Sequence, residues 1–469
     1  MTLTSRSAEN QDRKVGSVRP SQLMFSYGVG AIVDLPYLSV LVMGLDDWQA
    51  NAEVSPAITE ERLLRAVQWE LGEQASRLIT PPAAADSVGY FDPFSASNLV
   101  GAPVATFPRW MVCPRCQLLA PLSSTLFELQ SEPFRPEQAR YIHKNCNKAI
   151  RPTVVPARFL VACENGHLDD FPWIDFVHNG NPCGSPLLRL IEYGPGGEAR
   201  ELEVRCDNCG AVRRMSEAFG ERGKVTLPLC RGRRPHLRDF DESGCDKQVR
   251  TLLLGTSNIW FPEVLTTLAI PAGSARLDQL VDQQWVRMQS IQNVQNVALL
   301  RQFGQLGDLM EYEDDAIWQA VQRRRHRQDT SEGEPMDLKT PEWNILCNPE
   351  RQRSSEDLRL RRVSVPSDFE GLIEKVVLVE RMREVRALIG FTRIIAPEDF
   401  EDESRTKVGK RVPMSRRNPT WAPATDVRGE GIFVQFREAA LQQWFGRVQM
   451  SEFADKYLEA HRRWRRVRG

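Results

Sequence analysis

Cysteine is the residue type in this sequence with the clearest chemical potential. The 469-residue chain has ten cysteines, and nine of them lie between Cys113 and Cys245. The amino terminus, MTLTSRSAEN, lacks the charged and then apolar pattern of a secretory signal, so we expect a cytoplasmic protein. Thiols stay reduced in that compartment, and clustered thiols there favour metal binding over disulfides. The sequence therefore predicts zinc sites.

The first expected site joins two pairs of residues with the same spacing. Cys113 and Cys116 form a C-x2-C pair, and His143 and Cys146 follow after 26 intervening residues at H-x2-C spacing. A tight turn directs both side chains of such a pair towards one tetrahedral Zn²⁺ ion. We therefore predict a Cys₃His structural site, with small hydrophobic core cysteines as the alternative interpretation.

The second expected site has four cysteine ligands. Cys206 and Cys209 form another C-x2-C pair, directly before Gly210, as in the knuckle of a zinc ribbon. Cys230 and Cys245 follow at wider and irregular spacing. A Cys₄ zinc site is predicted here, and a group of buried thiols without metal is the alternative.

Four further residues could form a third site, namely Cys163, His167, His178 and Cys183. Their order, C-x3-H followed by H-x4-C, is a permissible but uncommon zinc pattern. Two alternatives stay open. Either Cys163 or His167 completes the first site, or these residues have a structural role without metal. The sequence thus predicts two zinc sites and leaves a third open.

No catalytic residue is predicted. The chain has no G-x4-G-K-[ST], no G-x-S-x-G and no H-E-x-x-H motif, so we expect a protein without enzymatic activity. A weaker alternative is a metal-dependent nuclease or hydrolase that uses His167 with Asp169. The opposing interpretation is that Asp169 and Asp170 cap a helix that begins near residues 171–173.

Arginine is the residue type that would carry any contact with nucleic acid. The formal net charge of the chain is −1, so a contact with polyanions would need a local basic patch. Residues 205–250 are rich in arginine, and a solvated surface is the alternative interpretation there. The candidate phosphate-binding residues are Arg213, Arg214, Arg231, Arg233 and Arg234.

The elements that must position these residues are short and of mixed type. The segments ARFLVAC (157–163) and ELEVRC (201–206) resemble strands that deliver a cysteine to a turn. Residues 58–78 have the apolar periodicity of an amphipathic helix, and the chain from residue 437 onward is expected to be helical. We predict a multi-domain α+β protein with a central zinc-ribbon-like module and a helix-rich carboxyl-terminal part. The expected parts are an α+β region at 1–105, a zinc-binding region at 106–260 and a mixed helical region at 261–469.

Several segments together resemble one known family. In chain order they are VRPSQLMFSYGVGAIVDLP, FPRWMVCPRC, PARFLVACENGHLDDFPW, MREVRALIGFTRI and GEGIFVQFREAALQQW. This set resembles the DrmB family, the zinc-binding subunits of the DISARM anti-phage system. The resemblance runs from about Val18 to Trp444.

The resemblance implies a function that the motifs alone do not. Members of the family pair with the helicase-like subunit DrmA, and the pair is implicated in engaging foreign DNA. No membrane association is expected. Family members usually carry a C-x2-C pair where this chain has Cys146 and Ala149, so His143 is expected to have taken over that ligand role. The further carboxyl-terminal domain of the family, with its own cysteines, is expected to be absent.

Overall fold

The computed structural model forms two compact units. Unit 1 combines Met1–Leu265 with Arg386–Thr425, and unit 2 combines Thr266–Val385 with Asp426–Gly469. Each unit combines segments that are distant in the sequence. The expected three-part division along the chain therefore stays a prediction. The structure describes residues 2–3, 13–48, 55–83, 100–194, 199–270, 277, 280–329, 337–351, 354–397, 411–449 and 451–468.

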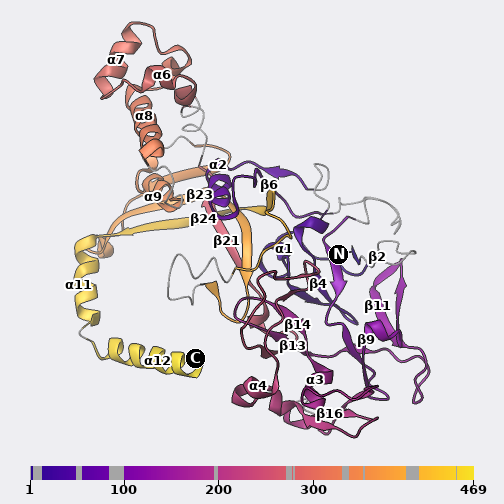
Figure 1. Cartoon of the computed structure of the whole chain (residues 1–469). Helices are drawn as coiled ribbons and strands as arrows, with labels where there is room; N and C mark the ends of the chain where they lie inside the picture. The colour runs from indigo at the N-terminus through magenta and orange to yellow at the C-terminus, as the bar shows by residue number, and fades with distance from the viewer. Residues whose placement is uncertain are drawn as a thin grey trace. The chain divides into compact units, whose positions relative to one another are not determined.

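Unit 1 is built mainly from short strands, which form several small sheets (Figure 1). Its strands are β1 (Thr2–Leu3), β2 (Arg13–Lys14), β3 (Ile32–Asp34), β4 (Ser39–Val42), β5 (Ala57–Ile58), β6 (Arg77–Ile79), β7 (Pro103–Thr106), β8 (Trp110–Val112), β9 (Leu118–Pro121), β10 (Phe127–Glu132), β11 (Arg135–His143), β12 (Val155–Pro156), β13 (Phe159–Ala162), β14 (Leu168–Asp170), β15 (Leu188–Glu192), β16 (Leu202–Cys206), β17 (Val212–Arg214), β18 (Arg233–Arg234), β19 (Asp239–Phe240) and β20 (Arg250–Leu253). Its helices are α1 (Gln22–Phe25), α2 (Glu61–Leu71), α3 (Trp173–His178) and α4 (Gly220–Thr226).

Three sheets that lie wholly in unit 1 have three or more strands, and the second and third of them lie in the cysteine-rich region. A five-stranded sheet has the order β2-β1-β7-β4-β3, and a six-stranded sheet has the order β12-β8-β9-β15-β16-β17. A third sheet, β14-β13-β20, pairs Leu160 with Leu252 in antiparallel register. All four residues of β13 are buried, because this strand packs on both faces. The strands predicted in ARFLVAC and ELEVRC are present as β13 and β16.

The helix predicted for residues 58–78 is wrong in its length. Helix α2 ends at Leu71, because the next residue is Gly72 with φ at +98°. The chain then forms β6, which pairs in parallel with the first residues of β24, Trp421 to Pro423. The apolar periodicity of residues 58–78 does not show where the helix ends, whereas Gly72 is a typical helix-ending residue.

Unit 2 contains the helix-rich part. Its helices are α6 (Trp285–Met288), α7 (Val294–Gln302), α8 (Asp314–Asp329), α9 (Lys339–Cys347), α11 (Glu438–Gln449) and α12 (Glu452–Arg468). Its strand β22 (Leu358–Val363) pairs with β23. The strands β21 (Phe261–Leu268), β23 (Ile373–Thr392) and β24 (Trp421–Phe436) have residues in both units.

The predicted fold class is confirmed. The structure combines several sheets with carboxyl-terminal helices, and its cysteine and histidine clusters are compatible with zinc-binding modules. None of the described helices is both long enough and apolar enough to cross a lipid bilayer.

Candidate metal centres

Cluster 1 consists of Cys113, Cys116, His143 and Cys146, the four residues expected at the first site. The turn between β8 and β9 carries both residues of the C-x2-C pair, and the Cys113 N–H donates to the Leu118 carbonyl across it (2.9 Å). Strand β11 ends at His143. Its Nδ1 lies 3.6 Å from the Cys116 Sγ, and the Cys113 and Cys146 sulfurs are 3.8 Å apart.

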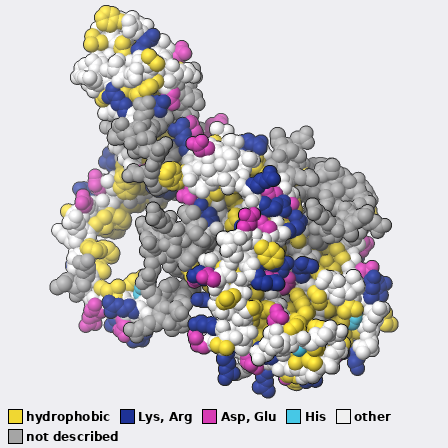
Figure 2. All heavy atoms as spheres, viewed as in Figure 1, with side chains coloured by type: hydrophobic (Ala, Val, Ile, Leu, Met, Phe, Trp, Pro, Cys, Tyr) yellow, Lys and Arg dark blue, Asp and Glu magenta, His cyan; other side chains and the backbone are white. Residues whose placement is uncertain are grey.

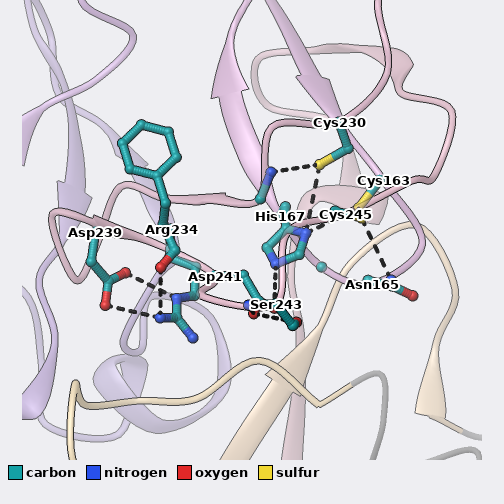
Figure 3. Close-up of polar contacts among 12 residues, drawn as sticks. Cys163, Asn165, His167, Cys230, Arg234, Asp239, Asp241, Ser243 and Cys245 are labelled. Carbon is teal, nitrogen blue, oxygen red and sulfur yellow. Dashed lines mark hydrogen bonds and ion pairs between the residues drawn. The ribbon is translucent and has the colours of Figure 1, made fainter.

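Cluster 2 brings together Cys163, His167, Cys230 and Cys245 (Figure 3). The turn between β13 and β14 holds the first two residues, and the pairing of β13 with β20 brings the chain near Cys245 alongside them. The Cys163 and Cys245 sulfurs are 3.9 Å apart. The His167 Nδ1 lies 3.5 Å from the Cys163 Sγ and 3.6 Å from the Cys230 Sγ.

A carboxylate orients the histidine of cluster 2. His167 Nε2 lies 3.2 Å from Asp241 Oδ2, and an ionised carboxylate can only accept, so Nε2 carries the proton. The lone pair of Nδ1 is therefore directed at the sulfur atoms. Carboxylate–histidine pairs of this kind hold metal-ligating imidazoles in proteins. The sequence pattern did not predict Asp241, since nothing in the linear order of residues connects it with His167.

Cluster 3 consists of His178, Cys183, Cys206 and Cys209. Helix α3 ends at His178, whose Nδ1 donates to the Ile174 carbonyl at 2.8 Å. The second ring nitrogen, Nε2, is buried and has no hydrogen-bond partner in the described structure. A buried acceptor without a partner is costly, and metal coordination would satisfy it. The Cys183 and Cys206 sulfurs are 3.7 Å apart.

The separations within the clusters match a tetrahedral zinc site. With Zn–S bonds of about 2.3 Å and Zn–N bonds of about 2.0 Å, two sulfur ligands lie about 3.8 Å apart, and a sulfur and a nitrogen ligand about 3.5 Å. The observed sulfur pairs are 3.7, 3.8 and 3.9 Å apart, and the sulfur–nitrogen pairs are 3.5 and 3.6 Å apart. A disulfide would need about 2.0 Å between its sulfurs. Each cluster could therefore hold one metal ion.

The grouping of the ligands differs from the sequence expectation for two of the three clusters. The structure does not bring Cys206 and Cys209 together with Cys230 and Cys245 as one Cys₄ group. It also separates Cys163 and His167 from His178 and Cys183. Cys163 and His167 instead join Cys230 and Cys245, and His178 and Cys183 join Cys206 and Cys209. All three clusters are therefore Cys₃His.

Each cluster lowers the pKa of one of its thiols, Cys146, Cys163 or Cys206, while burial raises the pKa of neighbouring thiols such as Cys116 and Cys245. Hydrogen bonding from Cys230 and from His167 lowers the pKa of Cys163 to about 4, in spite of its burial. Burial opposes ionisation of Cys206, but backbone N–H groups, among them that of Cys209, bring its pKa down to about 6. Thiolates are the form of cysteine that binds metal. The tenth cysteine, Cys347, belongs to none of the three clusters, and burial raises the pKa of its thiol.

Four of the five candidate DNA-binding arginines hold partners within the protein. Arg231 and Arg233 bond to Asp169, and Arg234 pairs with Asp239. Arg213 donates to the Phe176 carbonyl at 2.8 Å. Arg214 is exposed at the end of β17. The five residues therefore do not form one patch of unpaired cations, and contact with nucleic acid stays a prediction.

Asp169 and Asp170 have a different role from the predicted helix cap. Neither side chain caps α3, whose first residue follows Pro172. Both carboxylates instead accept from Arg233, beside a cavity of about 410 Å³ that is also lined by His167. A hydrolytic site would need Asp169 free to bind a metal or a water molecule, whereas here it is engaged by two arginines.

Comparison with known proteins gives two matches. Over 391 residues the chain is 25% identical to the DISARM protein DrmB of Bacillus paralicheniformis, and the match covers 81% of this chain and 67% of that protein. This chain is thus a distant homologue of DrmB. A family model described as a domain of unknown function, DUF8724, matches residues 19–261, which is more than half of the chain and contains all twelve residues of the three clusters. The chain therefore belongs to the DUF8724 family.

Proposed function

We propose that this chain is a zinc-binding, non-catalytic subunit of a DISARM anti-phage complex in the cytoplasm. The observation that carries the proposal is the set of three Cys₃His clusters with tetrahedral spacing in a distant homologue of DrmB. Each cluster offers four protein ligands, which closes the coordination shell of zinc and leaves no position for a substrate. Reduced thiolate ligands also fit a cytoplasmic protein.

The metal ions would fix the turns that carry their ligands. The clusters join segments far apart in the sequence, such as Cys163 and Cys245, and ordering such loops costs conformational entropy. Metal binding supplies free energy of folding directly. Unit 1 would then be a rigid scaffold and not a reaction centre.

Helix α11 of unit 2 supplies a surface for a protein partner. Leu441, Trp444 and Phe445 lie at helical spacing and are 42%, 53% and 56% exposed. Figure 2 shows hydrophobic side chains gathered on the surface of this helix. Exposed apolar stripes of this kind mark interaction sites, and aromatic residues are typical anchors. We propose that this face docks on the helicase-like subunit DrmA, and that foreign DNA is engaged by the assembled pair.

One experiment tests the proposal as a whole. The tagged chain is co-expressed with DrmA, purified in reducing buffer, and examined for bound subunits, for zinc by elemental analysis, and for ATPase activity of the chain alone. We expect DrmA to co-purify, about three zinc ions per chain, and no ATP hydrolysis without DrmA. A native chain free of zinc, or one that hydrolyses ATP or cleaves DNA alone, would contradict the proposal.

A further inference from the structure

Arg393 of unit 1 is a buried cation that has no carboxylate partner within the described part of the chain. Its side chain is 1% exposed and stacks on the ring of Phe391, with 4.9 Å between the guanidinium carbon and the ring centroid. Three backbone carbonyls accept its hydrogen bonds, those of Gly166 (3.0 Å), Ile259 (2.6 Å) and Gly30 (2.8 Å). These carbonyl groups accept from three of the five guanidinium N–H groups but do not neutralise the charge.

Two partly buried arginines of unit 1, Arg233 and Arg411, have the carboxylate partners that are missing at Arg393. Arg233 bonds to two aspartates, and Arg411 bonds to Glu70 and Glu263. Among the described residues, no hydrogen bond or ion pair of Arg393 reaches a carboxylate. A charge in a low-dielectric interior needs an opposite charge nearby, since burial alone is strongly unfavourable.

Cluster 2 is a source of negative charge that acts on Arg393. Gly166, which accepts from the Arg393 Nε, lies in the turn between Cys163 and His167, and its N–H donates to the Cys163 carbonyl at 3.0 Å. Its φ of +80° favours glycine at this position. Burial lowers the pKa of Arg393 to about 9, and the Cys163 thiolate opposes that change, so the guanidinium is charged at neutral pH.

Cluster 2 is anionic if zinc is bound, and the Asp241 carboxylate beside His167 adds to its negative charge. Three thiolates, one neutral imidazole and one Zn²⁺ ion leave a single net negative charge at a Cys₃His site. We infer that Arg393 is the counter-cation of zinc-loaded cluster 2, and that it positions the turn between Cys163 and His167 so that the ion is retained. This inference rests on the proposed zinc occupancy.

Zinc release from the full chain tests the inference. Zinc-loaded protein is mixed with an excess of a colorimetric chelator, and the released ion is followed over time. Partners in the outer shell of a metal site change affinity by about 10–100-fold, so in Arg393→Gln we expect one of the three ions to leave at least about tenfold faster. Arg393→Lys keeps the charge and is expected to release zinc more slowly than Arg393→Gln does.

Arg411→Gln is the matched control. It also removes a buried guanidinium from unit 1, but Arg411 bonds to two glutamates and to no residue of a cluster. We expect lower stability in this variant with unchanged zinc release. Equal release from Arg393→Gln and Arg411→Gln, or faster release of all three ions together, would overturn the inference.

A second variant keeps the test decisive if Arg393→Gln does not fold. Cys245→His replaces a thiolate by a neutral ligand, which removes the net negative charge of the zinc ion and its four ligands. Arg393→Gln is then expected to yield soluble, zinc-bound chain in the Cys245→His background, and failure to do so contradicts the inference. A wild-type chain that binds no zinc at all is a separate outcome, which rejects the proposed function before any variant is compared.

Discussion

Asp169 and Asp170 show how single residues in the cysteine-rich region depend on their partners. Their side chains are 12% and 11% exposed, and that of Arg233, which bonds to both, is 17% exposed. Arg231 also bonds to Asp169, but its own side chain is 67% exposed. The same residue type thus occupies one buried and one solvated position beside the same carboxylate.

Substitution of these two arginines by alanine is expected to have unequal effects. Arg233→Ala leaves Asp170 without a cation and Asp169 with only the exposed Arg231, which should lower the free energy of unfolding by about 3 kcal/mol. Arg231→Ala removes a solvent-screened contact, which should cost about 1 kcal/mol or less. Urea unfolding of the zinc-loaded variants measures both values. Similar losses for the two variants would contradict the difference in burial.

His236 predicts a pH dependence of stability. Burial, together with the nearby charge of Arg393, lowers the pKa of His236 to about 3, while its Nε2 donates to the Pro413 carbonyl. The unfolded chain takes up a proton on this side chain below about pH 6.5 and the folded chain does not. The stabilising contribution is therefore complete above that pH and declines as the pH falls towards 3.

Substitution of His236 by glutamine should remove this dependence. Glutamine keeps an N–H donor for Pro413 but does not titrate. Between pH 6.5 and 5 we expect the free energy of unfolding of His236→Gln to fall less steeply than that of the wild type, by up to about 1.4 kcal/mol per pH unit. Urea titrations at several pH values, with the zinc content measured in parallel, provide the comparison. Parallel curves would show that His236 is not the titrating group.

At the scale of elements, the local patterns were predictable and the pairing of distant strands was not. Both halves of cluster 1 were predicted, because Cys113 with Cys116 and His143 with Cys146 are each separated by two intervening residues. The hairpin β10–β11 lies between the two pairs and brings them together. Clusters 2 and 3 depend on the register of β13 with β20 and of β15 with β16. Ligand spacing within a half does not reveal which halves meet, so the expected Cys₄ set was divided.

Helix α11 carries the element-scale prediction. Trp444→Ser together with Phe445→Ser should weaken binding to DrmA by about 2 kcal/mol or more, as expected for aromatic anchors. Both side chains are more than half exposed, so the thermal stability of the free chain should change little. Affinity is measured by titrating purified DrmA with the chain. Phe303→Ser, at a position 71% exposed elsewhere in unit 2, is the control. Unchanged binding in the double variant would exclude this face as the docking surface.

For the whole molecule, metal removal should affect the two units differently. All twelve cluster residues belong to unit 1, while unit 2 has a separate hydrophobic core formed by residues such as Val281 and Ile317. Chelation under reducing conditions should therefore make residues 106–260 sensitive to protease, because unligated thiolates repel one another and the loops regain entropy. The helices α7 and α8 should stay protected. Limited proteolysis with mass spectrometry measures this, and zinc, but not magnesium, should restore protection.

Ligand order along the chain has a consequence for biosynthesis. The residues of cluster 3 lie between the two halves of cluster 2, so the two sites are nested in the sequence. A polypeptide leaves the ribosome from its amino terminus, and a site closes only after its last ligand has emerged. Cluster 1 is complete at Cys146, cluster 3 at Cys209 and cluster 2 at Cys245, and Arg393 emerges later still. The nascent chain can therefore complete cluster 3 before cluster 2, which encloses it in the sequence. Arg393, the counter-cation inferred for cluster 2, is synthesised last.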